Sequence, residues 1–340
     1  MNARTDARSG PAAGLAVLVN ANAKRGGRRI AVQIAQALPG ASVRLTKSIS
    51  EIAAWMRVLD RPRCILAAGG DGSAIAMINA AAEVWPEDAP LPMFGVFPLG
   101  TGNGWAHAMG APKLDRCLRV LRAARDPLPA RTYGMFEIEG KMAHFAGCGY
   151  DAMILDDYKT QLAQSKGPAS IVSKSVYGYL SATLFRTTPK IVIHGIPNVI
   201  IENLGDDAYT VSADGKVLRL HDVRRGSVLY DGPVGVVGAG TSPEFGYRFK
   251  AFPFAERMPG YVNIRVYDAG PIKAVASIPQ LWRGTHPLLG MHDWFVKDAR
   301  LTFSRLVPLQ VGGDALGMRR SVEIRIAPRA VRMLDWRRML

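Results

Sequence analysis

The sequence predicts an α/β domain followed by a second domain rich in β-strands. Between residues 15 and 125, short apolar runs alternate with longer amphipathic ones, which is the pattern of strands followed by helices. After residue 134, strand-like segments with alternating polar and apolar residues dominate. The chain has 340 residues, and at roughly 150 residues per domain two domains are the expected number.

The first part of the chain contains a succession of strand-then-helix units. The strands are predicted at residues 15–20, 42–46, 64–69 and 93–98, and the helices at residues 28–38, 50–60, 73–84 and 113–124. Such a succession favours a mostly parallel sheet that is covered by helices. Because ligands bind beyond the carboxyl ends of the strands in these sheets, the loops after the strands are the first candidates for function.

The pattern changes after the segment DPLPARTYG at residues 126–134, so we place a domain boundary near residue 130. Strand-like segments beyond it lie at residues 135–140, 141–147, 190–195, 198–203, 216–222, 226–232, 235–240 and 261–268. Helices are predicted near residues 152–164, 170–187 and 271–283. The second domain is therefore expected to be mainly β structure, in a chain without internal repeats.

Composition and charge limit the possible classes of function. The chain has 43 Lys and Arg against 28 Asp and Glu, a net charge of +15, and 48% of its residues are hydrophobic. Such a chain can bury a core, and its charge favours a partner with phosphates: a nucleic acid, a nucleotide or an anionic membrane. Three cysteines are too few for a disulfide framework. With no signal peptide or spanning apolar segment evident, we expect a soluble or peripheral protein.

The segment CILAAGGDGSAIAMINA at residues 64–80 carries the most informative motif. A strand runs into Gly69, Gly70, Asp71 and Gly72, and Ser73 opens a helix. Glycines let the backbone approach a phosphate closely, and a helix start offers free N–H groups. A carboxylate such as Asp71 repels phosphate unless a divalent cation or a transferable proton lies between them. A tight turn capped by Asp71 or Ser73 explains the motif equally well.

Two further loops follow predicted strands. The loop GTGNG at residues 100–104 follows the strand at 93–98, and its Thr101 and Asn103 supply side-chain hydrogen bonds. The first strand ends in NANAKRGG at residues 20–27, for which a solvated basic turn is the alternative interpretation. Two glycine-rich loops after strands of one sheet favour a nucleotide ligand over plain turns.

Other well-known motifs of nucleotide and metal sites are absent from the sequence. There is no GxxxxGK[ST] segment, and no HExxH or Cys/His pairing that suggests zinc. The loop after the first strand does not fit the GxGxxG of dehydrogenases.

Together the three loops resemble those of the diacylglycerol kinase catalytic family, which includes bacterial lipid kinases, sphingosine kinases and ceramide kinases. That family carries an Asn-containing loop, a GGDGT/S loop and a PxGTGN loop in this order, and the chain has NANAKRGG, GGDGS and PLGTGN. GCGYDAMIL at residues 147–155 is similar to the family's G-x-G-x-D/E segment, and YGYLSATLF at 177–185 to its following helix. QVGGDALG at residues 310–317 occupies the place of the family's DGE segment.

The resemblance implies an NAD-kinase-like pair of domains. The α/β nucleotide-binding domain is expected at residues 14–130, completed by 318–340, and a β-sandwich domain for the lipid substrate at 131–317. The implied reaction transfers the γ-phosphoryl group of ATP, with Mg²⁺, to the hydroxyl of a membrane lipid of the diacylglycerol, sphingoid or ceramide type. The implied nucleotide-binding residues are Asn20, Asn22, Lys24, Gly69, Gly70, Asp71, Gly72, Ser73, Gly100, Thr101, Gly102 and Asn103.

Three carboxylates are the implied catalytic candidates. Asp71 is the first choice, as general base or as organiser and ligand of the metal ion. Asp151 resembles the acid that lies beside the acceptor's head group in sphingosine kinases, although capping of the following helix explains it equally well. Asp314 stands where the Glu of the DGE segment would be.

The chain departs from the family pattern at three places. Gly104 replaces an Asp that sphingosine and ceramide kinases also lack, which tilts the acceptor toward a sphingolipid. Gly312 replaces the first Asp of the DGE segment, the general base proposed in bacterial members. RMPGYVNIRV at residues 257–266 lacks the acids of the family's DDGxLDV stretch, which argues against a structural Mg²⁺ site there. The alternative function is therefore a nucleotide-binding regulatory protein of the same fold that has lost kinase turnover.

A lipid kinase is expected to be cytoplasmic and to act at the inner face of an anionic membrane. Three segments are candidates for the contact: the helix at 170–187, the aromatic loop at 245–254, and the C-terminal segment. Core packing, a strand edge and a solvated terminus are the respective alternatives. The basic residues of the C-terminal segment are Arg329, Arg332, Arg337 and Arg338, around Trp336. No motif for nucleic acid is present, so none is expected as a partner, and a homodimer stays open.

Overall fold

A computed structural model describes residues 12–21, 27–100, 103–150, 152–153, 195–243, 249–284 and 288–340. The chain divides into two compact units, each of which is described by itself. Unit 1 comprises Met1–Tyr133 and Pro328–Leu340, and unit 2 comprises Gly134–Ala327. The chain returns to unit 1 at residue 328 rather than at the expected 318, because the long strand that ends at Ile326 stays in unit 2.

Unit 1 contains a six-stranded sheet with the order β2-β1-β3-β4-β18-β5. Its strands are β1 Leu15–Asn20, β2 Ser42–Thr46, β3 Cys64–Gly69, β4 Met93–Pro98, β5 Ala130–Tyr133 and β18 Val331–Leu334. Its helices are α1 Gly27–Ala37, α2 Ile49–Val58, α3 Asp71–Val84, α4 Gly104–Ala108, α5 Leu114–Ala123 and the 3₁₀ helix η3 Trp336–Met339. All neighbouring strands of this sheet pair in parallel except β5, which is antiparallel to β18. The predicted parallel α/β domain is confirmed.

The positions of the strands in this sheet explain their sequences. β3, CILAAG, is buried at every residue, and β1, LAVLVN, at every residue but the last. Central strands of a parallel sheet are covered on both faces and therefore carry continuous apolar runs. The edge strand β2 exposes Ser42 and Arg44 instead, and polar residues at an edge discourage pairing with other chains.

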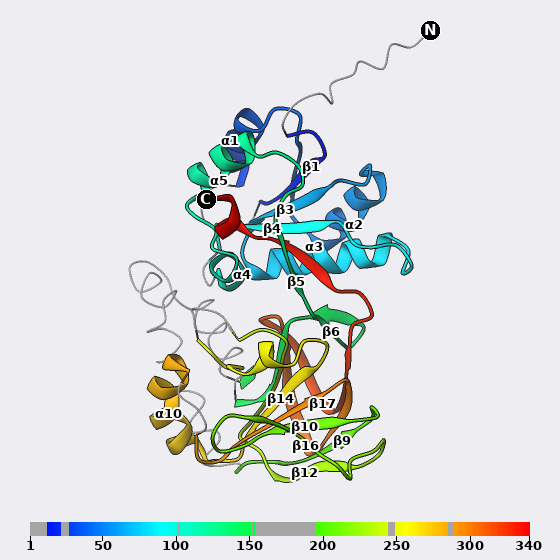
Figure 1. Ribbon diagram of the computed structural model, residues 1–340, viewed down its shortest axis with the longest axis vertical. Helices are drawn as coiled ribbons and strands as arrows, with labels where there is room; N and C mark the ends of the chain where they lie inside the picture. The colour runs from blue at the N-terminus through cyan, green and yellow to red at the C-terminus, as the bar shows by residue number, and fades with distance from the viewer. Residues whose placement is uncertain are drawn as a thin grey trace. The chain divides into compact units, whose positions relative to one another are not determined.

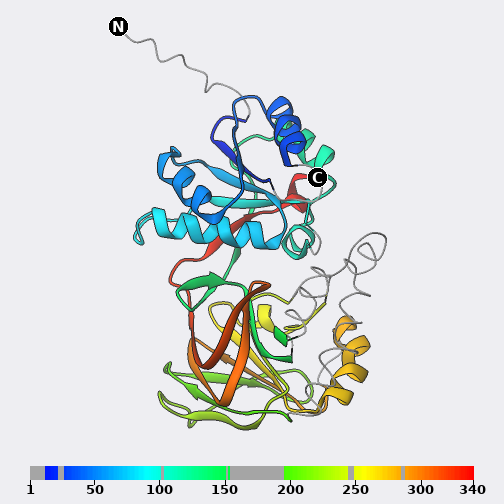
Figure 2. The ribbon, with the colours of Figure 1, turned by 180° about the vertical axis from the view of Figure 1, so that it is seen from behind.

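The helices of unit 1 pack as two pairs, α2 with α3 and α1 with α5. Figures 1 and 2 show the two pairs on different sides of the sheet, as right-handed crossover connections require. Ser48 begins α2, and its side-chain oxygen accepts the N–H of Glu51 at 3.3 Å. α3 and α4 begin directly after β3 and β4, so both helix starts lie at the carboxyl edge of the sheet.

The C-terminal segment returns to unit 1 and inserts β18 between β4 and β5 (Figure 1, red). Trp336 follows it with no exposed surface, and its ring centre lies 5.9 Å from that of Phe97. The backbone N–H of Trp336 donates to the carbonyl of Met109 at 3.1 Å. Both interpretations of this segment, as a membrane contact or a solvated terminus, are wrong for β18 and Trp336, because these residues complete the sheet and its core.

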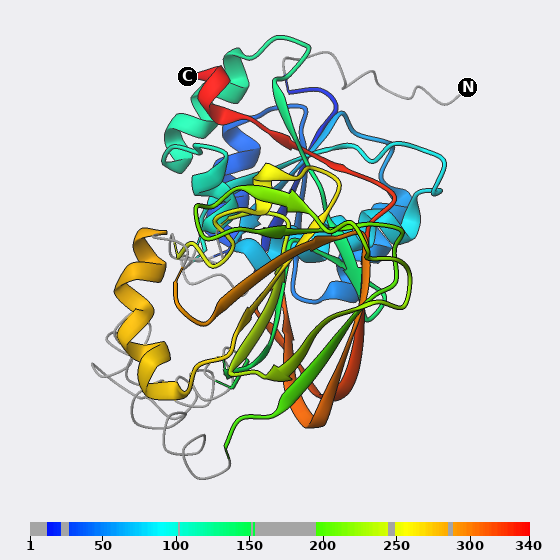
Figure 3. The ribbon, with the colours of Figure 1, turned by 60° about the horizontal axis from the view of Figure 1, so that its bottom comes forward.

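Unit 2 is built on a twelve-stranded sheet in which every strand pair is antiparallel. Its strands are β6 Phe136–Ile138, β7 Lys141–Ala143, β8 Phe145–Gly149, β9 Asn198–Asn203, β10 Ala208–Val211, β11 Val217–Arg219, β12 Val228–Pro233, β13 Val236–Gly240, β14 Val262–Tyr267, β15 Met291–Val296, β16 Asp298–Val311 and β17 Asp314–Ile326. The helices described in it are η2 Ala255–Arg257 and α10 Pro271–Arg283. Figure 3 shows the long hairpin of β16 and β17 in orange and red.

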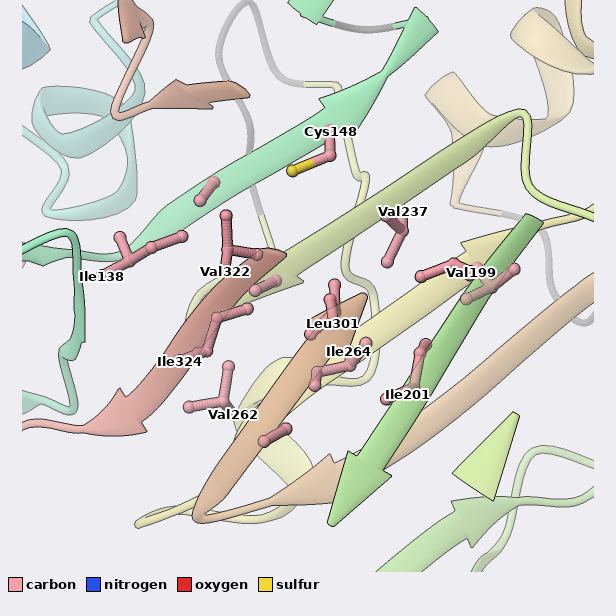
Figure 4. Packing of buried hydrophobic residues seen from close by; sticks show 14 of the residues in the cluster. Ile138, Cys148, Val199, Ile201, Val237, Val262, Ile264, Leu301, Val322 and Ile324 are labelled. Atoms are coloured by element: carbon pink, nitrogen blue, oxygen red, sulfur yellow. The ribbon is translucent and has the colours of Figure 1, made fainter. Parts of the chain in front are cut away.

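The core of unit 2 forms where apolar side chains from several strands face one another (Figure 4). Val199 and Ile201 of β9 meet Leu301 of β16 and Val322 and Ile324 of β17, and each is 2% exposed or less. The contributing residues of one strand are two positions apart, as expected when one face of a sheet is buried. The predicted β-rich second domain is thus confirmed.

The helix predicted at 271–283 is α10, with the same bounds. Residues 154–164, 170–187 and 190–194, predicted as helix or strand, lie outside the described residues. Within the described residues, no helix combines the length and the apolar sequence that crossing a bilayer requires.

Candidate active site

The three loops singled out from the sequence lie at one edge of the sheet in unit 1. Asn20 ends β1, the GGDG loop (residues 69–72) ends β3 and opens α3, and the GTGN loop (residues 100–103) follows β4. β3 lies between β1 and β4 and pairs with both in parallel. The carboxyl ends of the three strands therefore adjoin, which is where ligands bind in sheets of this kind.

Glycines bring the GGDG and GTGN loops into backbone contact. A Cβ atom built on Gly100 would lie 2.3 Å from the Cα of Gly70 and 3.1 Å from its nitrogen. A Cβ atom built on Gly69 would lie 2.4 Å from the Oγ of Ser73. A side chain at Gly100 would push the two loops apart, and one at Gly69 would displace the side chain of Ser73, so both glycines have a packing role in addition to the predicted one toward a ligand.

Asp71 joins the GGDG loop to helix α4. Its Oδ2 accepts the backbone N–H of Gly104 at 2.9 Å, and its Oδ1 accepts that of Trp105 at 3.0 Å. The first N–H groups of a helix have no acceptor within the helix itself, so Asp71 satisfies two of them from another loop. Capping of its own helix was the alternative interpretation of Asp71 from the sequence, whereas the structure shows it capping the next helix.

The protonation of Asp71 is set by opposing influences. Burial raises the pKa of its carboxyl above the ordinary value, while the N–H bonds from Trp105 and Gly104 and the charge of His107 lower it. Burial is the largest of these influences. The raised pKa brings the carboxyl closer to the range in which a general base works. Both oxygens nevertheless hold N–H groups, which gives Asp71 a part in fixing the two loops.

Two asparagines predicted to bind the nucleotide also hold the loops together. The Nδ2 of Asn20 donates to the Oγ of Ser73 at 3.1 Å and ties the end of β1 to the start of α3. Asn103 accepts the N–H of Gly100 at 2.8 Å and donates to its carbonyl at 3.0 Å. Asn103 has a φ of 51°, a left-handed conformation that Asn adopts more readily than most residues. The local turn thus explains why Asn stands at this position.

Space for a ligand remains beside Gly72 and the start of α3. A Cβ atom on Gly72 would meet no atom of the described residues within 4 Å, and the residue is exposed. No side chain caps the N-terminus of α3, a helix of 14 residues. An open helix start beside a bare backbone is an arrangement that binds phosphate groups.

Two residues of this region were not among those predicted. The Nδ1 of His107, on α4, is buried and has no hydrogen-bond partner within the described residues. Gly27 opens α1, where a Cβ atom would lie 2.7 Å from both the Cα of Ala21 and the carbonyl oxygen of Asn20. Gly27 could have been found from its place between an Asn-containing loop and a helix, whereas nothing in the sequence distinguishes His107.

The other predicted residues lie outside the described residues or belong to unit 2. Asn22, Lys24, Thr101, Gly102 and Asp151 lie outside the described residues. Asp314 opens β17 in unit 2 and is exposed.

Gly312, which replaces the first Asp of the DGE segment, belongs to the tight turn of the β16–β17 hairpin. Gly312 and Gly313 have φ values of 58° and 88°. Two successive residues with positive φ are typical of two-residue hairpin turns, where glycine is strongly favoured. The geometry of the turn therefore accounts for glycine at this position.

The described residues can hold Mg²⁺ only together with the phosphates of a bound nucleotide. They contain no group of three or more His, Cys, Asp or Glu side chains that could hold a metal ion by themselves. Mg²⁺ at phosphoryl-transfer sites is commonly held by one or two carboxylates together with the phosphates of the substrate. Asp71 is the carboxylate that borders both glycine-rich loops. It could therefore hold Mg²⁺ jointly with the phosphates of the nucleotide.

Two phenylalanines of the aromatic loop at 245–254 belong to the core of unit 2, whereas Lys250 of the same loop is exposed. Phe252 and Phe254 are 2% and 4% exposed. Phe252 packs against Gly240 of β13, and Arg257 and Arg265 lie 4.8 and 5.4 Å from the ring centre of Phe254. The expected membrane contact is therefore wrong for these two phenylalanines, and the candidate helix at 170–187 lies outside the described residues.

Arg329 of the C-terminal segment is bound to the end of α3. Its Nη2 donates to the carbonyl of Ala82 at 2.8 Å, and its Nη1 to those of Trp85 and Pro86 at 3.1 Å each. Arg337 likewise donates to the carbonyl of His107 at 3.4 Å. Arg329 therefore serves the fold of unit 1, while Arg337 is exposed and its side chain makes this long bond to the backbone of unit 1.

Comparison with known proteins supports the resemblance seen in the sequence. Residues 14–129 match the model of the diacylglycerol kinase catalytic domain family. This range includes all three loops of the candidate site. No curated protein matches the chain.

Solved structures share the fold over nearly the whole chain. The crystal structure of a diacylglycerol kinase from Bacillus anthracis str. Sterne is 15% identical, covers 94% of this chain and 96% of its own, and has a TM-score of 0.59. Two other structures from that strain are 15% and 14% identical, cover 94% and 96% of this chain and 96% and 98% of their own, and have TM-scores of 0.61 and 0.62. At these identities the likeness establishes the fold.

Proposed function

We propose that this chain, whose residues 14–129 carry a catalytic domain of the diacylglycerol kinase family, transfers the γ-phosphoryl group of ATP to a hydroxyl group of a membrane lipid. One observation supports the proposal most directly. The GGDG and GTGN loops touch through their glycines, and beside them Gly72 and the uncapped start of α3 leave room for phosphates.

Phosphoryl transfer depends on this kind of arrangement. The protein has little covalent chemistry to perform and acts by positioning the phosphates and stabilising their charge. The free N–H groups at the start of α3 donate to phosphate oxygens, and Gly72 lets those oxygens approach the backbone. The contact between Gly70 and Gly100 fixes the spacing of the backbone at these two positions before ATP binds, which lowers the cost of arranging the site.

In this proposal Asp71 is the organising carboxylate of the site. Its two bonds to the backbone of α4 favour a role in holding the loops and the metal over that of a free base. When bound, Mg²⁺ supplies positive charge that offsets the charge of the transferred group. Asp151 and Asp314 remain the proposed carboxylates for the acceptor hydroxyl.

We propose unit 2 as the part that receives the lipid. Gly104 in place of the family's Asp favours a sphingoid or ceramide-type acceptor over diacylglycerol. The protein then works at the cytoplasmic face of a membrane, to which a net charge of +15 attracts it when the lipids are anionic.

The substitution Gly72→Ala tests the proposed phosphate site. The added methyl group meets no atom within 4 Å in the part of the chain that the structure describes, so the fold is expected to persist while the methyl occupies the space for phosphate. ATP affinity, measured by calorimetry, should fall by roughly tenfold or more. Gly270→Ala is the matched control, because it adds a methyl group in equally open space before α10 and should leave ATP affinity unchanged.

The reaction itself is tested with labelled ATP and a panel of diacylglycerol, monoacylglycerol, sphingosine and ceramide in detergent micelles. Labelled lipid from the native chain, and much less from Gly72→Ala, supports the kinase. Equal ATP affinity of Gly72→Ala and the native chain would contradict the phosphate site.

The alternative is a regulatory protein that binds ATP without turnover. It is favoured by Gly312, since the hairpin turn places no carboxylate where bacterial members have one. Tight ATP binding that is lost in Gly72→Ala, together with no labelled lipid across the panel, would establish the regulator and reject the kinase.

A further inference from the structure

An arginine-lined groove lies in unit 1 and shares no residue with the three loops of the candidate active site. It has a volume of about 460 Å³ and is formed by α5, the segment that follows it and the end of η3. Its charged lining consists of Arg116 and Arg119 on α5, Arg125 after that helix, and Arg338 on η3. This groove is called the arginine groove below.

The pattern of α5 directs these arginines away from the core. Leu118 and Leu121 of α5 are buried, whereas Arg116 and Arg119 are exposed. Residues three positions apart on a helix lie on the same side, so the two guanidinium groups of α5 are neighbours. Val120, the residue after Arg119, adds an apolar side chain to the lining of the groove.

The four arginines of the groove have no acidic partner. None of their guanidinium groups forms an ion pair or a hydrogen bond within the part of the chain that the structure describes. The acids closest to them in sequence are engaged elsewhere: Asp115 accepts Gln33 at 2.8 Å, and Asp126 pairs with Arg63. Four like charges around one groove repel one another, and an anion between them would relieve that repulsion.

The wall that carries Arg338 is fixed in place. Asp335 caps η3 by accepting the N–H of Arg337 at 3.1 Å, and Trp336 is wholly buried. Arg337 also donates to the carbonyl of His107. The groove is therefore formed by ordered elements of unit 1 and not by a loose chain end, which limits the entropy lost when a ligand binds.

We propose that the arginine groove binds the phosphate group of a phosphate ester, as a ligand additional to ATP. A guanidinium group presents its N–H donors in a planar fork that matches the oxygens of phosphate. The groove is much larger than one phosphate and is lined by Val120, Leu128 and Met339 as well as by arginines, so the organic part of an ester has apolar contacts. The ester is supplied by a soluble metabolite or by a phospholipid head group.

This proposal does not depend on kinase activity, and its test measures binding alone. The probes are glycerol 3-phosphate, and vesicles of phosphatidylcholine with or without phosphatidylglycerol. ATP is present at saturation throughout, so that a probe cannot occupy the nucleotide loops. Arg119→Gln removes a charge from the groove, and Arg122→Gln removes one from an exposed position of the same helix outside the groove lining.

Arg119→Gln should weaken binding by about tenfold, because a charge-assisted hydrogen bond to phosphate is lost. Arg122→Gln should change it much less, because Arg122 lies near Arg119 on the helix but does not line the groove, so its removal costs no hydrogen bond to the bound phosphate. Loss of glycerol 3-phosphate binding in Arg119→Gln identifies a soluble ester as sufficient. Loss of binding to phosphatidylglycerol vesicles alone identifies the lipid head group as the source.

Two results would overturn the proposal. One is the absence of binding to either probe by the native chain. The other is an equal loss in Arg119→Gln and Arg122→Gln, which would show a general effect of net charge. Unchanged thermal unfolding of both variants confirms that neither substitution acts through the fold.

Discussion

Gly70 and Gly100 lie in direct backbone contact, so close that a Cβ atom on Gly100 would come within 2.3 Å of the Cα of Gly70. The two residues belong to different loops, each at the end of its own strand. Since β3 and β4 are neighbours, this contact fixes the spacing of the two glycine-rich loops that the sequence marks as a phosphate site.

Gly100→Ala should therefore destabilise unit 1. The methyl group collides with backbone and not with a flexible side chain, so one loop must move, at a cost of about 1–3 kcal/mol. The change is measured by urea unfolding. Gly72→Ala is the control, because its methyl group is unopposed and alanine stabilises a helix by up to about 1 kcal/mol relative to glycine. Equal stabilities of the two variants would contradict the close contact.

Asp71→Asn should loosen the connection between the GGDG loop and α4. An amide offers one oxygen where the carboxylate offers two, so the N–H of Gly104 or of Trp105 loses its acceptor. We expect a loss of about 1–3 kcal/mol in the free energy of unfolding. Asp88→Asn, at an exposed loop position, is expected to change it by less than about 0.5 kcal/mol. A loss no larger in Asp71→Asn than in Asp88→Asn would argue against the capping role.

His144 should make unit 2 less stable in acid. Burial lowers the pKa of its ring from 6.5 to about 3, so the folded chain keeps it neutral while the unfolded chain takes up a proton below pH 6.5. This contribution to stability is present above pH 6.5 and is lost as the pH falls toward 3. Its slope approaches about 1.4 kcal/mol per pH unit.

The contribution of His144 is measured by unfolding at several pH values in the native chain and in His144→Gln, which cannot be protonated. The difference in stability between the two should shrink as the pH falls below 6.5. His221→Gln, on an exposed turn, serves as the matched control and should leave the dependence of the unfolding free energy on pH as it is in the native chain. A difference that stays constant with pH would contradict the buried neutral ring.

Arg329→Met should destabilise unit 1, although the residue lies only partly buried near the end of the chain. The substitution keeps an apolar stem and removes the bonds to the carbonyls that end α3, which are left without partners. A loss of about 1.5–3 kcal/mol is expected. Arg332→Met, at an exposed position of β18, should lower the free energy of unfolding much less. A larger loss in Arg332→Met than in Arg329→Met would refute the role assigned to Arg329.

The first four strands of unit 1, β1 to β4, could be predicted to the residue because their sequences are unambiguous, whereas the short strands β5 and β18 could not. The central strands β1 and β3 are continuous apolar runs that end at polar or glycine residues. β16 was not predicted, although it alternates. Pro308 lies within β16, and the pairing of β16 with β17 shifts register twice. Both features make a strand hard to recognise in the sequence.

The residues of the candidate site could be predicted from the sequence, but the hydrogen bonds that join its loops could not. Glycine-rich loops after successive strands identify where a ligand binds. The sequence does not show that Asp71 accepts N–H groups 33 and 34 residues further along the chain. Every residue except proline has a backbone N–H group, so the identities of Gly104 and Trp105 do not reveal that they donate to Asp71. Only the folded structure shows these hydrogen bonds.

The insertion of β18 between β4 and β5 has a consequence for biosynthesis. The sheet of unit 1 lacks an inner strand until residues 331–334 have been synthesised, even though its first strand emerges from the ribosome near residue 20. Unit 2 is continuous in sequence and has all of its strands once residue 326 is made. Unit 1 can therefore close its sheet only by pairing β18 with β4 and β5, from which the whole of unit 2 separates it in sequence, and such long-range pairing is slow and leaves apolar strands open to aggregation until it is complete.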